Sequence, residues 1–199
     1  ARFVRRRLIR RKYVSRRDPL APPVTAPLHL LQDRCTAAPG LLAQIIVSKY
    51  CDHLPLYRQE QIFKTRHGIL IPRQTMARWL AMTADWLRPL YREIKTTVMD
   101  GGCVQIDESP VKYLEPGHGK TKQGYLWAVN RPRCAQRSPS AIFFAWHASR
   151  AASCLEDIIP AGWGGKLQCD GYTAYDAFVR RREEPITLVA CMAHIRRGF

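Results

Sequence analysis

The spacing of apolar residues changes from helical to strand-like near the middle of the chain. From residue 41 onward apolar side chains recur every three or four residues, which predicts helices over 41–50 and 57–66. We expect the second helix to stop at Gly68, because glycine readily adopts the left-handed turn, and Pro72 to open a third helix. The apolar stripe of this third helix consists of Met76, Leu80, Ala84 and Leu87.

The second half of the chain has the pattern of an alternating strand and helix protein. Short β-like runs lie at residues 103–107, 125–129, 141–146, 166–170 and 187–190, and helices are expected at 150–159, at 172–178 and from 191 onward. Three strands are therefore followed by a helix, a strand, a helix, a strand and a helix. This order predicts α/β layers of the ribonuclease-H-like type.

The second and third predicted helices, joined by a short turn that contains glycine, have the pattern of a helix-turn-helix unit. The residues exposed at the start of the third helix would be Arg73, Gln74, Thr75 and Arg78, which are types that hydrogen-bond to bases and phosphates. An ordinary helical hairpin with a solvated polar face remains the alternative interpretation.

Charge narrows the choice of partner. The 199 residues include 32 Lys and Arg against 16 Asp and Glu, a formal charge of +16, which favours nucleic acid first and an anionic membrane second. Much of the excess lies in residues 1–17, a run without acids that we expect to act as an extended interaction arm. A proline-rich linker follows, and a boundary is expected near Pro39-Gly40.

Several protein classes are excluded by what the sequence lacks. No run approaches 18 apolar residues, so no transmembrane helix is expected, and the fingerprints of P-loop, Rossmann and α/β-hydrolase enzymes are missing. The seven cysteines are odd in number and contain no C-x-x-C pair. We therefore expect free thiols, a reducing cytoplasmic location and no complete zinc site in this chain.

Two aspartates stand out as candidates for chemistry. Asp107 and Asp170 each follow a short apolar strand and precede a turn, so both carboxylates emerge at one edge if the strands are neighbours. Paired carboxylates suit Mg²⁺, which can support phosphoryl transfer. Strand-end acids are also common turn formers, and that alternative stays open. Glu108 would point to the opposite face from Asp107, which favours a structural role.

The predicted last helix carries a smaller candidate group. Cys191 and His194 are three residues apart, which is half of a metal site. His194 with Arg196 and Arg197 would either grip phosphates or form a solvated helix face.

Four long segments resemble successive blocks of the insertion-sequence-66 family of bacterial transposases. The resemblance covers about residues 40–199, and the blocks come in the order of the family with similar gaps. The segments are LLAQIIVSKYCDHLPLYRQEQIF (41–63), QIDESPVKYLEPGHGKTKQGYLW (105–127), LQCDGYTAYD (167–176) and CMAHIRRGF (191–199).

The resemblance implies a DDE transposase with a helix-turn-helix-like region ahead of a ribonuclease-H-like catalytic core. Asp107 and Asp170 match the first two catalytic, metal-ligating aspartates, with Mg²⁺ or Mn²⁺ as cofactor, and the third acid, a glutamate, is expected beyond Phe199. His194, Arg196 and Arg197 would lie near the active site or the DNA. The implied parts are 1–39 as basic arm and linker, 40–99 as helical DNA-binding region, and 100–199 as the first, incomplete portion of the catalytic core.

The expected function is that of a transposase of a bacterial insertion sequence, which binds element ends and target DNA and, when complete, performs metal-dependent strand cleavage and transfer. Ser15 stands where the family has a cysteine, so 1–39 is interpreted as the remnant of a zinc-binding segment and zinc is not expected here. Without the third acid we expect this chain to be inactive alone. An inactive DNA-binding remnant and a related nuclease are the alternatives. A homo-oligomer stays open, and no membrane partner is expected.

Overall fold

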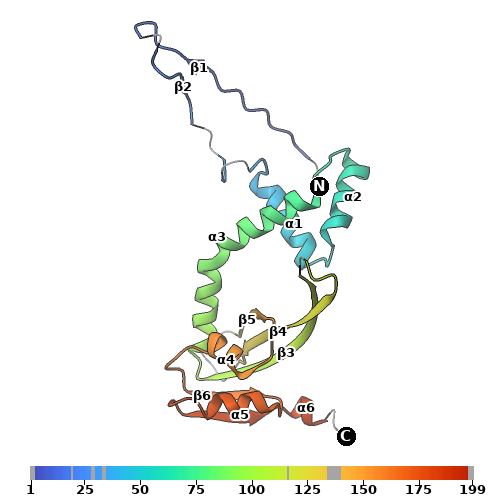
Figure 1. The fold of residues 1–199 in the computed structure, drawn as a ribbon, viewed down its shortest axis with the longest axis vertical. Coiled ribbons are helices and arrows are strands. Elements are labelled where there is room, and N and C mark those ends of the chain that lie inside the picture. The colour runs from blue at the N-terminus through green and yellow to red at the C-terminus, as the bar shows by residue number, and fades with distance from the viewer. Residues whose placement is uncertain are drawn as a thin grey trace. The chain divides into compact units, whose positions relative to one another are not determined.

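The structure is a computed structural model that describes residues 3–18, 20–27, 30–32, 35–115, 117–133 and 140–196. The chain divides into two compact units, Ala1–Leu87 and Arg88–Phe199, and the long helix α3 (Arg73–Met99) contributes to both (Figure 1). Each unit has its own cluster of buried apolar side chains. The two units therefore fold around separate cores.

The first unit, Ala1–Leu87, consists of a short hairpin followed by helices. Its core is centred on Ile45, Phe63 and Met76, which come from three successive helices and are all buried. The three helices predicted from the apolar spacing are confirmed. The elements are β1 (Lys12–Tyr13), β2 (Val24–Thr25), α1 (Pro39–Tyr50), α2 (Leu56–His67) and the first part of α3.

The end of α2 follows a local rule, whereas α3 does not end at its proline. The predicted stop at Gly68 is confirmed, since Gly68 has a φ of 66° and its N–H donates to the carbonyl of Lys64 at 3.1 Å. Helix α3 continues to Met99 although it contains Pro89, which has no N–H for the helical hydrogen bond. Among the described residues, no helix combines the length and apolarity that a membrane crossing requires.

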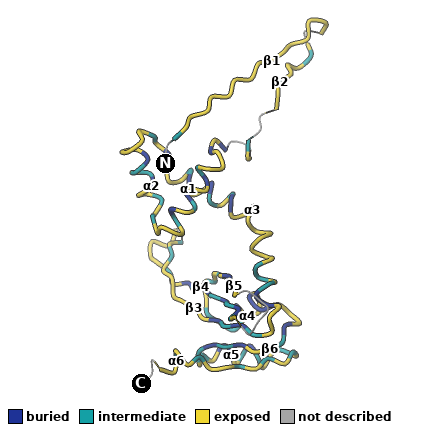
Figure 2. Tube along the Cα trace, turned by 180° about the vertical axis from the view of Figure 1, so that it is seen from behind, coloured by how far each residue is buried: buried dark blue, intermediate teal, exposed yellow. Residues whose placement is uncertain are grey.

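The basic arm contains a short hairpin that the sequence pattern did not predict. Strands β1 and β2 pair antiparallel, and the Arg10 guanidinium donates to the carbonyl of Ala26 across the hairpin at 3.0 Å. At the turn, Ser15 Oγ accepts the N–H groups of Arg17 and Asp18. Figure 2 shows the hairpin as mostly exposed. The hairpin thus pairs the like-charged run 1–17 with the proline-rich linker that follows it.

The second unit, Arg88–Phe199, is built on a five-stranded mixed sheet with the order β5-β4-β3-β6-β7. The first three strands pair antiparallel, and β6 and β7 add in parallel. The α/β class and the predicted order of strands and helices are confirmed. The elements are β3 (Cys103–Leu114), β4 (Thr121–Arg131), β5 (Ala141–His147), α4 (Ala152–Ile158), β6 (Gly165–Cys169), α5 (Thr173–Val179), β7 (Ile186–Ala190) and α6 (Met192–Arg196).

One face of this sheet forms the core of the second unit. Alternate strand residues pack there against α4, α5 and the end of α3, with Trp127, Leu155 and Phe178 fully buried. Because side chains alternate along a strand, the residues between them point to the opposite face. That opposite face contains Asp107.

Strand β3 is longer than predicted. The sequence indicated a strand over 103–107 followed by a turn at Glu108-Ser109-Pro110, and that turn is wrong because β3 continues to Leu114 in register with β4. Ser-Pro is a local turn signal, but cross-strand pairing overrides it here. Proline is tolerated because β6 pairs with β3 only as far as Gln105, which leaves that edge of β3 open at Pro110.

Candidate active site

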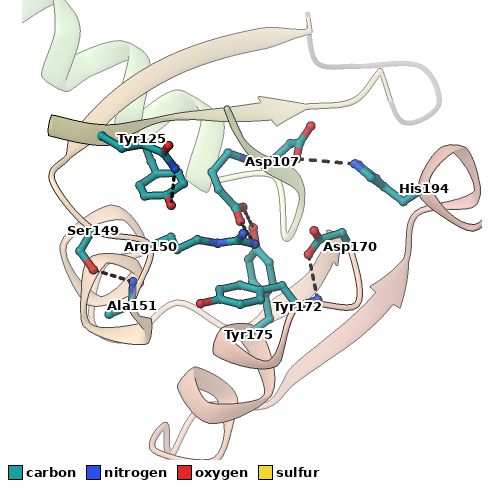
Figure 3. A network of polar contacts seen from close by, with 11 residues as sticks. Asp107, Tyr125, Ser149, Arg150, Ala151, Asp170, Tyr172, Tyr175 and His194 are labelled. Carbon is teal, nitrogen blue, oxygen red and sulfur yellow. Dashed lines mark hydrogen bonds and ion pairs between the residues drawn. The ribbon is translucent and has the colours of Figure 1, made fainter. Parts of the chain in front are cut away.

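The register of two parallel strands brings the two candidate aspartates together. Strands β3 and β6 pair with Gln105 opposite Gln168. The same register carried two residues further sets Asp107 opposite Asp170, which directly follows β6. Adjacent strands lie about 4.8 Å apart, and residues in register share a face. Figure 3 shows the two carboxylates in one neighbourhood.

Each aspartate is held by a short-range hydrogen bond. Asp170 Oδ1 accepts the N–H of Tyr172 at 2.9 Å, which orders the turn between β6 and α5. Asp107 Oδ1 accepts the N–H of Glu108 at 3.0 Å and lies 3.7 Å from Nε2 of His194. The side chain of Asp107 is 53% exposed, so one carboxylate of the pair is open to solvent or to a ligand.

A row of amide side chains lies next to the aspartates on the same face. Asn130 Nδ2 donates to Gln105 Oε1 at 2.7 Å, and Gln105 Nε2 donates to Gln168 Oε1 at 2.6 Å. The row crosses β4, β3 and β6. It ties the two strands that carry the aspartates together through side chains as well as through the backbone.

Glu108 lies on the other face, as alternation along the strand predicts. Its side chain is only 3% exposed, and it accepts from Arg150 Nη2 at 2.7 Å and from the Tyr175 hydroxyl at 2.8 Å. Burial raises the pKa of Glu108, with smaller opposing effects from Tyr175 and Arg150. Burial and the bond to Glu108 raise the pKa of Tyr175. These contacts make Glu108 a structural acid beneath the site.

Arg150 connects this buried acid to the turn that carries Asp170. Its guanidinium lies 3.7 Å from the ring centre of Tyr172 and 5.7 Å from that of Tyr125 (Figure 3). Arg150 thus braces Tyr172, whose N–H binds Asp170. The sequence pattern did not point to Arg150, which lies outside any motif, whereas Tyr172 and Tyr175 both lie in the block LQCDGYTAYD (167–176) without an assigned role.

Helix α6 contains His194 and Arg196, two of the candidate residues near the end of the sequence. His194 faces Asp107 from α6, with its Nε2 3.7 Å from Asp107 Oδ1. A hydrogen bond from His194 lowers the pKa of the Cys191 thiol. Arg196 is exposed, and Arg197 lies outside the described residues.

The candidate DNA contacts of the helical region lie in the first unit. At the start of α3, Arg73, Gln74 and Arg78 are exposed and Thr75 is half-buried. The backbone N–H of Arg73 donates to Glu60 Oε1 at 3.2 Å, so an α2 side chain caps the start of α3. Because they are exposed or half-buried, these four polar side chains can be reached by a ligand.

The donors at the aspartate pair match a hard cation. Within the described ranges no group of three or more His, Cys, Asp or Glu side chains forms a metal cluster. Mg²⁺ typically takes one or two carboxylates and completes its shell with water and substrate phosphate oxygens. The side chains of Asp107 and Asp170 are carboxylates of the type that such a shell uses.

Comparison with known proteins places this chain beside one family. The model described as "Transposase IS66 family" matches residues 34–199. The chain is 38% identical over 198 residues to the uncharacterized protein y4qI of Sinorhizobium fredii, covering 96% of this chain and 36% of y4qI. It is 39% identical over 169 residues to y4jD of the same organism, covering 82% and 33%. The chain spans about a third of the length of these relatives.

Proposed function

The chain belongs to the IS66 transposase family, and from this premise we propose that it is the portion of a bacterial insertion-sequence transposase that holds two acids of a DDE phosphoryl-transfer site. The observation that supports the proposal is the β3–β6 register, which pairs Gln105 with Gln168 and, continued by two residues, would set Asp107 opposite Asp170 on one sheet face. DNA at the element ends and at the target would be the substrate.

The topology of the second unit supports a ribonuclease-H-like core. Its central strand β3 has an antiparallel neighbour on one side and the parallel strand β6 on the other. A polar residue on β3 and a polar residue just after β6 would consequently be neighbours on one face of the sheet. The proposal assigns only the first two acids of the DDE set to this chain.

The residues of this site would have distinct roles. Asp107 and Asp170 would hold Mg²⁺ or Mn²⁺, which when bound polarises phosphoryl oxygens. His194 would orient the Asp107 carboxylate, which it faces at 3.7 Å. Arg150 would brace the Asp170 turn through Tyr172.

Binding of DNA would involve both units. Arg73, Gln74, Thr75 and Arg78 would contact bases or phosphates from α3, in the manner of a helix-turn-helix protein. The arm 1–17 would attract the phosphate backbone without sequence preference. Arg196 and Arg197 would add phosphate contacts, as the resemblance to the family implies.

The metal site can be tested on the 199-residue chain without any cleavage assay. The chain is titrated with Mn²⁺, and the free ion is measured by electron paramagnetic resonance. The dissociation constant for Mn²⁺ is expected to rise at least tenfold in Asp107→Asn and in Asp170→Asn. Asp176→Asn is the matched control, since Asp176 is an exposed acid of α5 and should leave Mn²⁺ binding unchanged. Equal affinity in Asp107→Asn and the parent would contradict the proposed site.

A further inference from the structure

The parallel pairing of β3 and β6 stops just before the two candidate aspartates. The last pair in the backbone register is Gln105 opposite Gln168. Asp107 and Asp170 follow two residues later, and β6 ends at Cys169, between Gln168 and Asp170. The backbone ladder by itself therefore does not fix the distance between the two carboxylates.

The side chains of the last backbone pair continue the link between the two strands. Gln105 Nε2 donates to Gln168 Oε1 at 2.6 Å, and both side chains are half-buried. Because side chains alternate along a strand, this bond lies on the face of Asp107, one step before the aspartates. A hydrogen bond that is partly shielded from water is electrostatically stronger than one in bulk solvent. It therefore holds β3 and β6 together at the point where the aspartates emerge.

The third amide of the row makes a different connection. Asn130 Nδ2 donates to Gln105 Oε1 at 2.7 Å and so joins β4 to β3. The backbone already pairs these two strands from Gln105 to Leu114. Of the two bonds in the row, the bond from Gln105 to Gln168 is the one that crosses to the strand of the second aspartate.

Another link lies beyond the aspartates, on the opposite face of the sheet. The hydroxyl of Tyr175 on α5 donates to Glu108 Oε2 at 2.8 Å. Asp107 thus lies between a link at Gln105 and a link at Glu108. The segment that carries Asp170 is bound to β3 on both sides of that residue. Two attachments on opposite faces restrict how far the two carboxylates can move apart.

The distance between two carboxylates affects which cation they bind. Mg²⁺ requires near-octahedral geometry with oxygens at about 2.0–2.1 Å, whereas Ca²⁺ accepts about six to eight oxygens at about 2.3–2.6 Å in a flexible arrangement. A pair of carboxylates held at a fixed spacing can therefore favour the smaller ion. A pair that is free to move apart loses this preference.

We propose that Gln105 and Gln168 are positioning residues, which set the spacing of Asp107 and Asp170 and thereby the preference of the site for Mg²⁺ over Ca²⁺. Neither amide has to touch the cation. This inference rests on the proposed function for the identity of the metal ligands, whereas the spacing itself is a property of the metal-free chain.

The spacing can be tested first on the metal-free chain. In Gln168→Met the side chain keeps a similar length but loses the oxygen that accepts from Gln105. The N–H of Tyr172, which donates to Asp170, is then expected to exchange with solvent about 2- to 12-fold faster, at the level of one lost hydrogen bond. Amide hydrogen exchange followed by NMR measures this rate. Asn130→Leu is the matched control, since it removes the amide bond on the β4 side and should leave Tyr172 unchanged.

The cation preference is measured by competition of Mg²⁺ and of Ca²⁺ with Mn²⁺, with the free Mn²⁺ read by electron paramagnetic resonance. In Gln168→Met the ratio of the Ca²⁺ to the Mg²⁺ dissociation constant should fall by about 2- to 12-fold. Asn130→Leu should keep the ratio of the parent chain. General destabilisation would weaken the binding of both ions alike, so an unchanged ratio in folded Gln168→Met would overturn the inference.

A third measurement needs no variant. Coupling between two sites is reciprocal, so bound Mg²⁺ must stabilise the amide pair if the pair favours Mg²⁺. The carboxamide protons of Gln105 should exchange about twofold more slowly or less when Mg²⁺ is added to the parent chain, whereas those of the exposed Gln74 should not change. Unchanged exchange at Gln105, in a chain that binds Mn²⁺ through Asp107, contradicts the positioning role alone. Absence of Mn²⁺ binding through Asp107 contradicts the proposed function, and exchange at Tyr172 in Gln168→Met then still decides whether the amides set the spacing.

Discussion

A single buried acid shows how the site depends on contacts between residues that are far apart in the sequence. Glu108 follows Asp107 in the sequence, yet it is buried on the opposite face, where it contacts Arg150 and Tyr175. A buried carboxylate is costly unless it is paired and hydrogen-bonded. The three side chains therefore stabilise one another and fix the strand that carries Asp107.

Removal of the arginine should destabilise the second unit. In Arg150→Met the apolar stem remains, but Glu108 keeps only Tyr175 as the partner seen here. The expected loss in the free energy of unfolding is about 1.5–3 kcal/mol, which is the usual contribution of a hydrogen bond to a charged group. A larger loss is not expected, because Arg150 is partly exposed and solvent screens its charge. Urea denaturation followed by circular dichroism measures it.

Arg181→Met is the matched control for this prediction. Arg181 is 63% exposed and lies 3.7 Å from Glu156, which is a surface ion pair. Its replacement should change the free energy of unfolding by about 0.5 kcal/mol or less. An Arg150→Met protein no less stable than Arg181→Met would show that the buried pair contributes little.

At the scale of elements, the end of α2 could be predicted and the length of β3 could not. Gly68 supplies a left-handed residue at the end of α2, and glycine signals that conformation by itself. The end of β3 depends on its partner, because residues 108–114 pair with β4 rather than form a turn. Periodicity reports which face of a strand is buried, but it does not report how far a neighbouring strand extends.

Substitutions at two glycines of the first unit can distinguish the effect of backbone strain from that of a steric clash. An added Cβ would meet nothing within 4 Å at either Gly68 or Gly40. Gly68→Ala should nonetheless destabilise by about 1–2 kcal/mol, because its φ of 66° disfavours a side chain. Gly40→Ala lies in the first turn of α1 and should stabilise by about 0.4–1 kcal/mol. Thermal or urea unfolding measures both changes, and a shared sign would refute this explanation.

For the whole molecule, the uneven charge predicts how binding depends on salt. Each phosphate contact contributes about 0.9 to the slope of log affinity against log salt concentration. Replacement of Arg5 and Arg6 by glutamine should reduce the magnitude of this slope for duplex DNA by about 2, since both side chains are exposed in the arm. Fluorescence anisotropy over a range of NaCl concentrations measures this slope.

The control carries the same change of charge elsewhere. Arg180 and Arg181 are exposed after α5, and their replacement by glutamine should lower the slope by less than about 1. If both double variants reduced the slope equally, the arm would have no special part in DNA binding. The general positive charge of the chain would then account for the salt dependence.

The sequence alone was sufficient for the class, the order of elements and the family. Apolar spacing is a local property, and it determines which segments become helices and which become strands. The two aspartates could also be selected, because each follows an apolar strand and belongs to a recognisable block. The common face of Asp107 and Asp170 was only a conditional expectation, since it required β3 and β6 to be neighbours.

Tertiary structure was needed wherever partners lie far apart in the chain. The pairing of β3 with β6, the burial of Glu108 against Arg150 and Tyr175, and the position of Trp146 over Gly124 all join separate segments. Such contacts depend on strand register and on which side chains meet across a sheet. A pattern along one dimension does not contain that information, because many pairings preserve the same alternation of apolar and polar residues.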